Sequence, residues 1–296
     1  MSGKCPNARD QSLEQQVRTL YTELALNWQR DFGWGKGKDN ARALGYDPAW
    51  LERLPEAVWE SAAAVGNPFT VGFIHSGETV VDLGCGAGAD VCVAALLVGS
   101  SGRVIGVDLT PAMVEKARAN AALCGFTNVQ IIEADIAELP LPDTCANVVF
   151  SNGVINLSSH KPCVLKEAFR VLKPDGRLYI ADMVRDTTTA DSQCGASSSE
   201  GSWANCVAGT IALEHFLQLL DEVGFAETTL IGTTGYRTSP ETIGALFRAR
   251  KPIELSPSHL INVPEPSCTY YGPDSHADSG GFSLPGASAA VNFPCA

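Results

Sequence analysis

The feature that most constrains the fold of this chain is an apolar run that ends in a glycine-rich turn, VVDLGCGAGAD at residues 80–90. The glycines Gly84, Gly86 and Gly88 let the backbone turn sharply and approach a ligand closely. A helix is expected after the turn, and the free N–H groups at its start can face the polar groups of that ligand. The same pattern also serves dinucleotide binding, so it predicts a ligand site between a strand and a helix without identifying the ligand.

Short apolar runs alternate with amphipathic helical segments from residue 78 to about residue 251. Such alternation is typical of βαβ units and predicts an α/β fold, with a Rossmann-like, mostly parallel sheet of seven strands flanked by helices. The last strand is expected to pair antiparallel with its predecessor. Strands are expected at 80–83, 104–107, 129–132, 148–150, 178–180, 228–231 and 243–248, and helices at 112–123, 162–171 and 212–223.

Composition and periodicity predict three parts of the chain. Residues 1–50 are expected to form an N-terminal cap, because apolar residues lie near helical spacing before a stretch rich in glycine and aromatic residues at 31–46. That stretch is either a mobile lid or a packed loop. Residues 51–251 are expected to hold the α/β domain. Residues 252–296 are rich in proline, serine and glycine and are predicted to be a mostly disordered tail.

The chain is acidic, with a formal net charge of −12. An acidic surface repels nucleic-acid phosphate and anionic lipid, so a small molecule is the expected partner, and neither nucleic acid nor membrane is. The N-terminus lacks the apolar core of a signal peptide, and the longest apolar stretch, at 91–98, is too short to span a bilayer. A cytoplasmic protein with mostly reduced cysteines is therefore expected, as a monomer or a homodimer. The ten cysteines contain no CxxC pair, which argues against a structural zinc site.

Polar residues follow three further expected strands. Asp108 ends the second strand, where a carboxylate can accept both hydroxyls of a ribose. Asp135 follows the third strand, where an acidic group beside a backbone N–H can read the amino edge of adenine. Asn152 and Gly153 end the fourth strand, over the crevice in which ligands of such sheets bind. Either aspartate alone could be a turn former at a strand end, but their order predicts a nucleoside site.

Asp82 lies two residues before the first glycine of the loop. A carboxylate at this place suits a positively charged ligand, whereas it would repel the pyrophosphate of a dinucleotide. The loop therefore favours a cationic cofactor over a nicotinamide cofactor.

This ordered set of motifs, together with LKPDGRLYIAD at residues 172–182, resembles the class I methyltransferases that depend on S-adenosylmethionine (SAM). The resemblance implies SAM as the cofactor, with its amino acid part bound by the glycine loop. The cofactor-binding residues that it implies are Asp82, Gly84, Cys85, Gly86, Gly88, Asp108, Leu109, Asp135, Ile136 and Asn152.

The strings GNPFTVG, SNGVINL and SWANCVAGT, at residues 66–72, 151–157 and 202–210, are similar to those of the arsenite methyltransferases. In that family cysteine thiolates hold trivalent arsenic over the SAM methyl group, as expected of soft ligands for a thiophilic centre. The resemblance implies that Cys206 and Cys92 are the catalytic arsenic ligands, although Cys92 lies one residue beyond the family position. Glutathione or thioredoxin is implied as the reductant.

The sequence departs from the family at Gly153, which stands where the arsenite methyltransferases have their central cysteine. A glycine cannot ligate arsenic, so Cys85, Cys163, Cys194 or a cysteine of the C-terminal tail would have to substitute, or arsenic carried by glutathione would need fewer protein ligands. The alternative to an arsenic ligand is that Cys206 is a buried residue that packs beside Trp203.

Three functions therefore compete. The leading hypothesis is SAM-dependent methylation of arsenite or methylarsenite. The second is methylation of an oxygen, carbon or sulfur of an organic metabolite, since Gly153 opens space for a larger acceptor. His160 and His215 could serve such an acceptor as bases, although surface, capping or structural roles are expected for both. The third is a module that binds SAM or sequesters arsenic without turnover.

Overall fold

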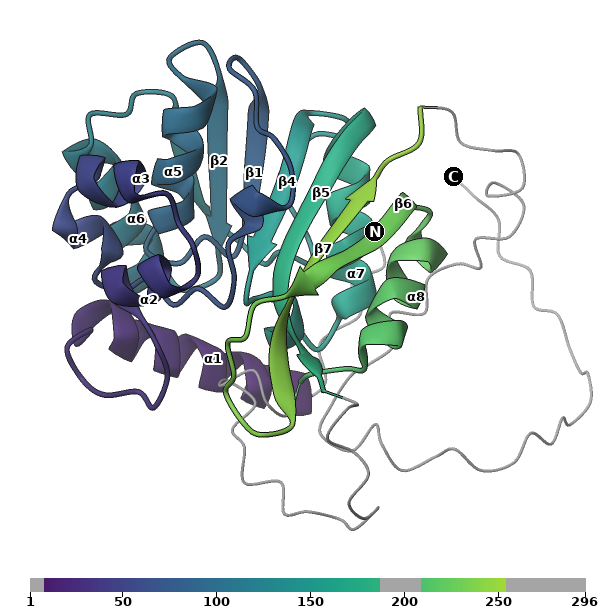
Figure 1. The fold of residues 1–296 in the computed structure, drawn as a ribbon, viewed down its shortest axis with the longest axis horizontal. Helices are drawn as coiled ribbons and strands as arrows, with labels where there is room; N and C mark the ends of the chain where they lie inside the picture. Colours follow the sequence, from purple (N-terminus) through teal and green to yellow (C-terminus); the bar gives the residue numbers. More distant parts are fainter. Residues whose placement is uncertain (1–7, 187–208, 254–296) are drawn as a thin grey trace, which may run out of the picture.

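The computed structural model describes residues 8–186 and 209–253, which form a seven-stranded sheet with helices on both faces (Figure 1). The strand order is β3-β2-β1-β4-β5-β7-β6, and β7 runs antiparallel to both of its neighbours. This confirms the predicted Rossmann-like sheet. The strands are β1 (Thr79–Leu83), β2 (Arg103–Asp108), β3 (Val129–Glu133), β4 (Ala146–Asn152), β5 (Leu172–Arg185), β6 (Ala226–Thr233) and β7 (Thr242–Arg250).

The helices begin and end where the local sequence predicts. Pro111 occupies the first turn of the helix after β2, where its missing N–H costs nothing. Gly224 follows the last helix with a φ of 104°, the left-handed conformation that ends many helices. The helices are α1 (Ala8–Leu26), α2 (Gly37–Ala43), α3 (Pro48–Arg53), α4 (Glu56–Trp59), α5 (Ala89–Val98), α6 (Pro111–Leu123), α7 (Lys161–Val171) and α8 (Leu213–Val223), with the 3-10 turns η1 (Pro68–Thr70) and η2 (Ile155–Leu157).

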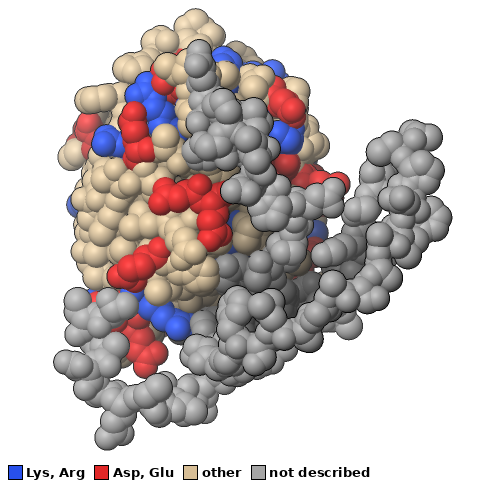
Figure 2. Space-filling view, turned by 90° about the vertical axis from the view of Figure 1, so that its right-hand side faces the viewer, with Lys and Arg blue, Asp and Glu red and all other residues tan. Residues whose placement is uncertain are grey.

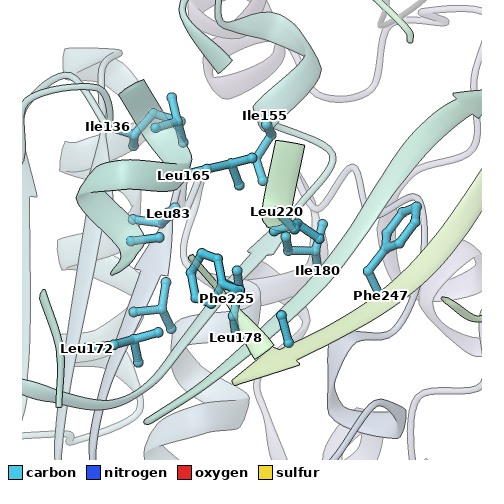
Figure 3. Close-up of a cluster of buried hydrophobic side chains, with 14 of the residues drawn as sticks. Leu83, Ile136, Ile155, Leu165, Leu172, Leu178, Ile180, Leu220, Phe225 and Phe247 are labelled. Carbon is cyan, nitrogen blue, oxygen red and sulfur yellow. The ribbon is translucent and has the colours of Figure 1, made fainter. Parts of the chain in front are cut away.

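Two apolar layers hold the helices to the sheet. One lies under α7 and α8, and Figure 3 shows its side chains converging from β1, β5 and β7. Phe216 of α8 stacks on Phe247 of β7 within it, with ring centroids 4.7 Å apart. The other layer lies under α5 and α6. The strands β1 and β4 between these layers are buried on both faces, as central parallel strands are, so their carboxyl ends are held rigidly.

The N-terminal segments form a third layer that continues into the main domain. The domain boundary predicted at residue 50 falls inside α3, and α2, α3 and α4 share one apolar cluster with α5. The sequence left open whether the stretch 31–46 is a mobile lid or a packed loop. In the structure, Ala41 and Tyr46 of this stretch are buried in that cluster. The second half of the stretch is therefore packed. The predicted tail lies almost entirely outside the described residues.

The charged surface is mixed. Acidic and basic side chains are interspersed over the described part of the face shown in Figure 2. Among the described residues, no helix combines the length and the apolar character needed to cross a membrane.

Candidate active site

A cavity of about 1110 Å³ lies at the carboxyl ends of β1, β2 and β4. Parallel sheets of this kind bind their ligands at this edge, where the strand order reverses beside β1. Helix α1 contributes Leu13, Val17 and Tyr21 to the lining, so it covers the opening from outside the sheet. The cavity thus lies between the sheet edge and the N-terminal segments, and it is partly open.

The glycine loop joins β1 to α5 and lines the floor of the cavity. Gly84 has a φ of 73°, and a Cβ there would overlap the side chain of Val154 beyond β4. Any other residue would push the loop away from β4. Asp108, at the end of β2, accepts hydrogen bonds from the backbone N–H groups of Gly86 at 2.8 Å and Thr110 at 2.9 Å. The sequence-predicted Asp108 therefore shapes the loop as well as lining the cavity.

Asp82 is buried at the end of β1 with one oxygen unpaired. Its side chain lines the cavity and is 2 % exposed, and Oδ2 has no hydrogen-bond partner. Burial raises the pKa of this carboxyl well above its usual value, and the nearby Asp90 and Asp108 raise it further. An unpaired buried carboxylate is costly for the folded protein. Such a group points to a cationic ligand, because a positive charge at this place would relieve the cost.

A polar network beside Asp82 connects α5, β4 and the N-terminal segments. Tyr46 donates its hydroxyl hydrogen to Asp90 Oδ1 at 2.8 Å, and Asn152 Nδ2 donates to Asp90 Oδ2 at 2.9 Å. The same amide accepts from the N–H of Val65 at 3.0 Å and donates to the carbonyl of Gly66 at 3.0 Å. All three side chains line the cavity. Asn152 is therefore placed at the site as expected, and its amide is held by several partners.

Burial raises the pKa of Asp90 to about 6, although the hydrogen bonds from Asn152 and Tyr46 oppose the shift. Burial also raises the pKa of Tyr46 well above its usual value, and the neighbouring Asp90 adds to this. The sequence reasoning missed both residues. Asp90 was visible as the last residue of the glycine string, but nothing in the sequence connects Tyr46 with it.

Arg18 fixes α1 to the end of β2. Its Nη1 donates to the carbonyl of Leu109 at 2.6 Å, and its positive charge opposes the rise that burial causes in the pKa of Asp108. On the adenine side that the sequence predicts, Asp135 and Ile136 line the cavity. Asp135 Oδ1 accepts from the N–H of Ala137 at 2.8 Å. Its other oxygen is available to a ligand.

The segment after β4 forms another part of the cavity wall, beside the glycine loop. Gly153 has a φ of 74°, and a Cβ there would lie 3.1 Å from Cγ1 of Val65. Two buried charges brace this wall from behind. Asp182 accepts from the N–H of Ile155 at 2.9 Å, and Lys161 Nζ donates to the carbonyl of Ser158 at 2.9 Å. The acceptor side of the cavity is therefore rigid, with Val65 in van der Waals reach of Gly153.

Of the two predicted arsenic ligands, Cys92 lies within the described residues. Cys92 is fully buried in α5 and is absent from the cavity lining, so the structure does not bring it to the acceptor side. The reason is that its side chain points into the cluster under α3 and α4. Cys206 lies outside the described residues, as do Cys194 and Trp203. Cys85 and Cys163 do line the cavity, and burial raises the pKa of the Cys85 thiol well above its usual value.

The two histidines differ in position. His160 lies in the cavity wall directly before α7, whereas His215 belongs to α8 and does not line the cavity. Only His160 is therefore placed where an acceptor could reach it.

The buried carboxylates should make the ligand-free protein less stable as the pH rises. Because the folded pKa of Asp90 is about 6 and the ordinary value is 3.8, the folded state holds a proton that the unfolded state has lost. Stability is then full below about pH 4 and declines as the pH rises through 6, by about 3 kcal/mol for this group. Urea unfolding of wild type and Asp90→Asn from pH 4 to 8 measures this. As the pH rises, wild type should lose stability relative to Asp90→Asn. The control is Asp221→Asn, at an exposed aspartate, whose stability difference from wild type should stay constant with pH. A constant difference for Asp90→Asn would contradict the expectation.

Comparison with known proteins agrees with the site. A family model described as "Methyltransferase domain" matches residues 74–224. The arsenite methyltransferase of Halobacterium salinarum is 40% identical over 182 residues, which are 62% of this chain and 46% of that protein. The arsenite methyltransferase of Aquipseudomonas alcaligenes is 37% identical over 193 residues, covering 62% of this chain and 55% of that protein. The chain thus spans about half the length of the curated relatives it matches.

A solved structure shows the same fold. The geranyl diphosphate methyltransferase in complex with GPP and sinefungin has a TM-score of 0.55 at 16% identity, over 81% of this chain and 99% of that one. At this identity the likeness concerns the fold alone.

SAM is the methyl donor of class I methyltransferases, and the cavity fits it. SAM carries an ammonium and a sulfonium, and the unpaired Oδ2 of Asp82 lies in a cavity that Asp90 and Asp108 also line. Asp108 and Asp135 lie at the ends of neighbouring strands, as a ribose and an adenine require. With the family model matching half of its length, the chain belongs to the methyltransferase domain family and has the class I fold.

Proposed function

We propose that this protein methylates trivalent arsenic, as arsenite or methylarsenite, with SAM as the methyl donor. The observation that carries the proposal is the identity of 37–40% with two arsenite methyltransferases over 62% of the chain. An acidic cavity with a wall held by buried hydrogen bonds supports it.

Each part of the cavity has a role in this reaction. Asp82 and Asp90 attract the cationic methionine end of the cofactor, and Asp108 and Asp135 hold its nucleoside. SAM supplies a methyl group on a positively charged sulfur, which makes that carbon electrophilic. Helix α1 lines one side of the cavity, so it limits the access of water to the transfer. The braced wall from Gly153 to His160 keeps the acceptor in line, which is the main requirement of such a displacement.

A soft acceptor suits the groups that are present. Trivalent arsenic carries a lone pair and loses no proton when it is methylated, so no residue has to act as a base. Thiolates bind such a centre well. In this proposal Cys206 is the principal arsenic ligand, and Cys85 is a free thiol that lines the cavity. Cys92 has no part in it.

The setting of the reaction belongs to the same proposal. Glutathione or thioredoxin supplies the reducing thiols, and the enzyme acts in the cytoplasm as a monomer or homodimer, without nucleic acid or membrane. The net charge of −12 supports the absence of anionic macromolecular partners.

An assay of the purified protein with SAM, glutathione and either arsenite or methylarsenite tests the proposal, with the arsenic species separated afterwards. Methylated arsenic is the expected product. If SAM binds but neither arsenical is methylated, the proposal fails.

One observation favours a second function, methylation of an organic metabolite. Beside Gly153, the apolar side chains of Val154 and Leu157 line the cavity. An organic acceptor could occupy this space. A methylated organic product from a metabolite screen, without any product from the arsenicals, would support this alternative.

Restoring the missing family cysteine should require two substitutions. Gly153→Cys alone places a Cβ against Val65 at a positive φ, so it should lower the free energy of unfolding by about 1–2 kcal/mol. Adding Val65→Ala removes the close contact and leaves room for the thiol. The double variant should methylate arsenite about 10-fold faster than wild type, because a further thiolate then faces the acceptor. Val65→Ala alone is the control. A folded, SAM-binding double variant that is no faster than this control would contradict the expectation.

A further inference from the structure

Two free thiols outside the cavity lie against each other. Cys92 is on α5, and Cys124 directly follows α6. Both belong to the apolar cluster under α3 and α4, and each thiol affects the pKa of the other. Neither lines the cavity. This pair is therefore spatially separate from the proposed methyl-transfer site.

The backbone fixes the two thiols in place. Gly88, the residue before α5, lies so close to α6 that a Cβ there would be 3.0 Å from that of Ala117. These small residues let the helices approach. The N–H of Cys92 donates to the carbonyl of Gly88, and the N–H of Cys124 donates to the carbonyl of Asn120. Each sulfur is thus attached to a hydrogen-bonded turn, and the pair is preorganised.

Access to the pair comes from the end of α6. Cys92 is fully buried, whereas Cys124 is partly exposed and its neighbour Leu123 is 58% exposed. Helix ends fray, and the residue after Cys124 is Gly125 in the left-handed conformation. A reagent would therefore meet Cys124 first and reach Cys92 when the end of α6 opens.

The number of ligands limits what can bind here. Within residues 8–186 and 209–253, no group of three or more His, Cys, Asp or Glu side chains could hold a metal ion. The pair therefore suits a thiophilic centre that takes two sulfur ligands from the protein. A monoorganic trivalent arsenical has this requirement, since carbon occupies one of its three bonds.

We propose that Cys92 and Cys124 form a second arsenical site, which binds monoorganic trivalent arsenicals as dithiolates outside the methyl-transfer cavity. The choice of arsenic rests on the proposed function. In the binding step two As–S bonds form and two As–OH bonds break. The two thiol protons leave with the hydroxides as two molecules of water, and arsenic stays trivalent, so no oxidant or reductant is consumed.

Two consequences follow. Burial raises the pKa of both thiols, so they are protonated at neutral pH and should react more slowly than exposed thiols. Once formed, the bridge joins the first turn of α5, next to the glycine loop, to the end of α6. Binding to the folded state in this way should raise the melting temperature.

The test uses phenylarsine oxide on the full, reduced chain, followed by digestion and mass spectrometry. The expected result is one phenylarsenic group that joins the peptide of Cys92 to the peptide of Cys124. Cys124→Ser should lose this joined species and keep methylation activity, and the matched control Cys145→Ser should retain it. Phenylarsenic found only on other cysteines, or a Cys92–Cys124 disulfide in its place, would overturn the proposal.

The experiment also separates this site from the proposed function. Cys206→Ser should abolish arsenic methylation and still give the joined peptides. If wild type gives the joined peptides but methylates no arsenical, the methylation proposal fails and the dithiol site stands. If wild type methylates arsenicals but never gives the joined peptides, the second site fails alone.

Discussion

Replacing Asp82 by asparagine should weaken SAM binding by about 100-fold or more, and it should stabilise the ligand-free protein. The two effects have one cause. The carboxylate is buried with Oδ2 unpaired, so it destabilises the empty fold and attracts a cation into it. Asparagine keeps the shape and removes the charge. Loss of one partner of a buried charge pair costs about 2–5 kcal/mol, which corresponds to the expected loss of affinity.

Isothermal titration with SAM and urea unfolding without ligand measure the two effects on the same preparation. If the variant is more stable than wild type, misfolding is ruled out as the reason for its weak binding. The unfolding measurement therefore serves as the control for the titration. S-adenosylhomocysteine lacks the sulfonium charge but keeps the ammonium, so a weakened affinity for both ligands would place Asp82 at the ammonium. An unchanged affinity for SAM would remove Asp82 from the cofactor site.

Cys206→Ser should lower the rate of arsenic methylation by at least about 100-fold and leave the affinity for SAM unchanged. A serine hydroxyl is a hard, weakly acidic group, so it cannot replace a thiolate on a soft centre. The measurement is methylated arsenic formed per enzyme at saturating SAM, with titration of SAM as the test of the cofactor site. Cys145→Ser is the matched control, because that thiol is partly buried and lies away from the cavity.

The same variant separates the two candidate functions. An enzyme that methylates an organic metabolite would keep substantial activity after Cys206→Ser. If arsenic methylation also persists at the wild-type rate, Cys206 is a packing residue, and the arsenic ligands have to be sought among Cys85 and the other cysteines.

The strands and the cofactor end of the site could be predicted from the sequence because local signals specify both. Alternation of apolar runs located the strands, and Asp82 and Asp108 lie at strand ends, whose place in a parallel sheet is fixed by topology. The lengths of the strands were harder to predict from the sequence. The strand expected at 178–180 extends from Leu172 to Arg185, because pairing with β7 continues along its whole second half.

The acceptor end could not be predicted, because its geometry depends on which face of a helix a residue occupies. Val91 and Cys92 are both fully buried in α5, and sequence spacing alone does not tell which of two adjacent buried positions points toward a cavity. The contact between Tyr46 and Asp90 spans 44 residues and has no local signature. The packing that continues across residue 50 through α3 is likewise a tertiary property without a local signature.

The amide of Asn152 has a consequence for how this protein can be dissected. Its hydrogen bonds to Tyr46, Val65 and Gly66 all reach segments before residue 74, where the family model begins. A fragment cut at residues 74–224 would lose these partners and also the edge strand β6 and its neighbour β7. The part of the chain that the family model matches is therefore not an autonomous folding unit, and truncation libraries should keep everything from α2 to β7 in one piece.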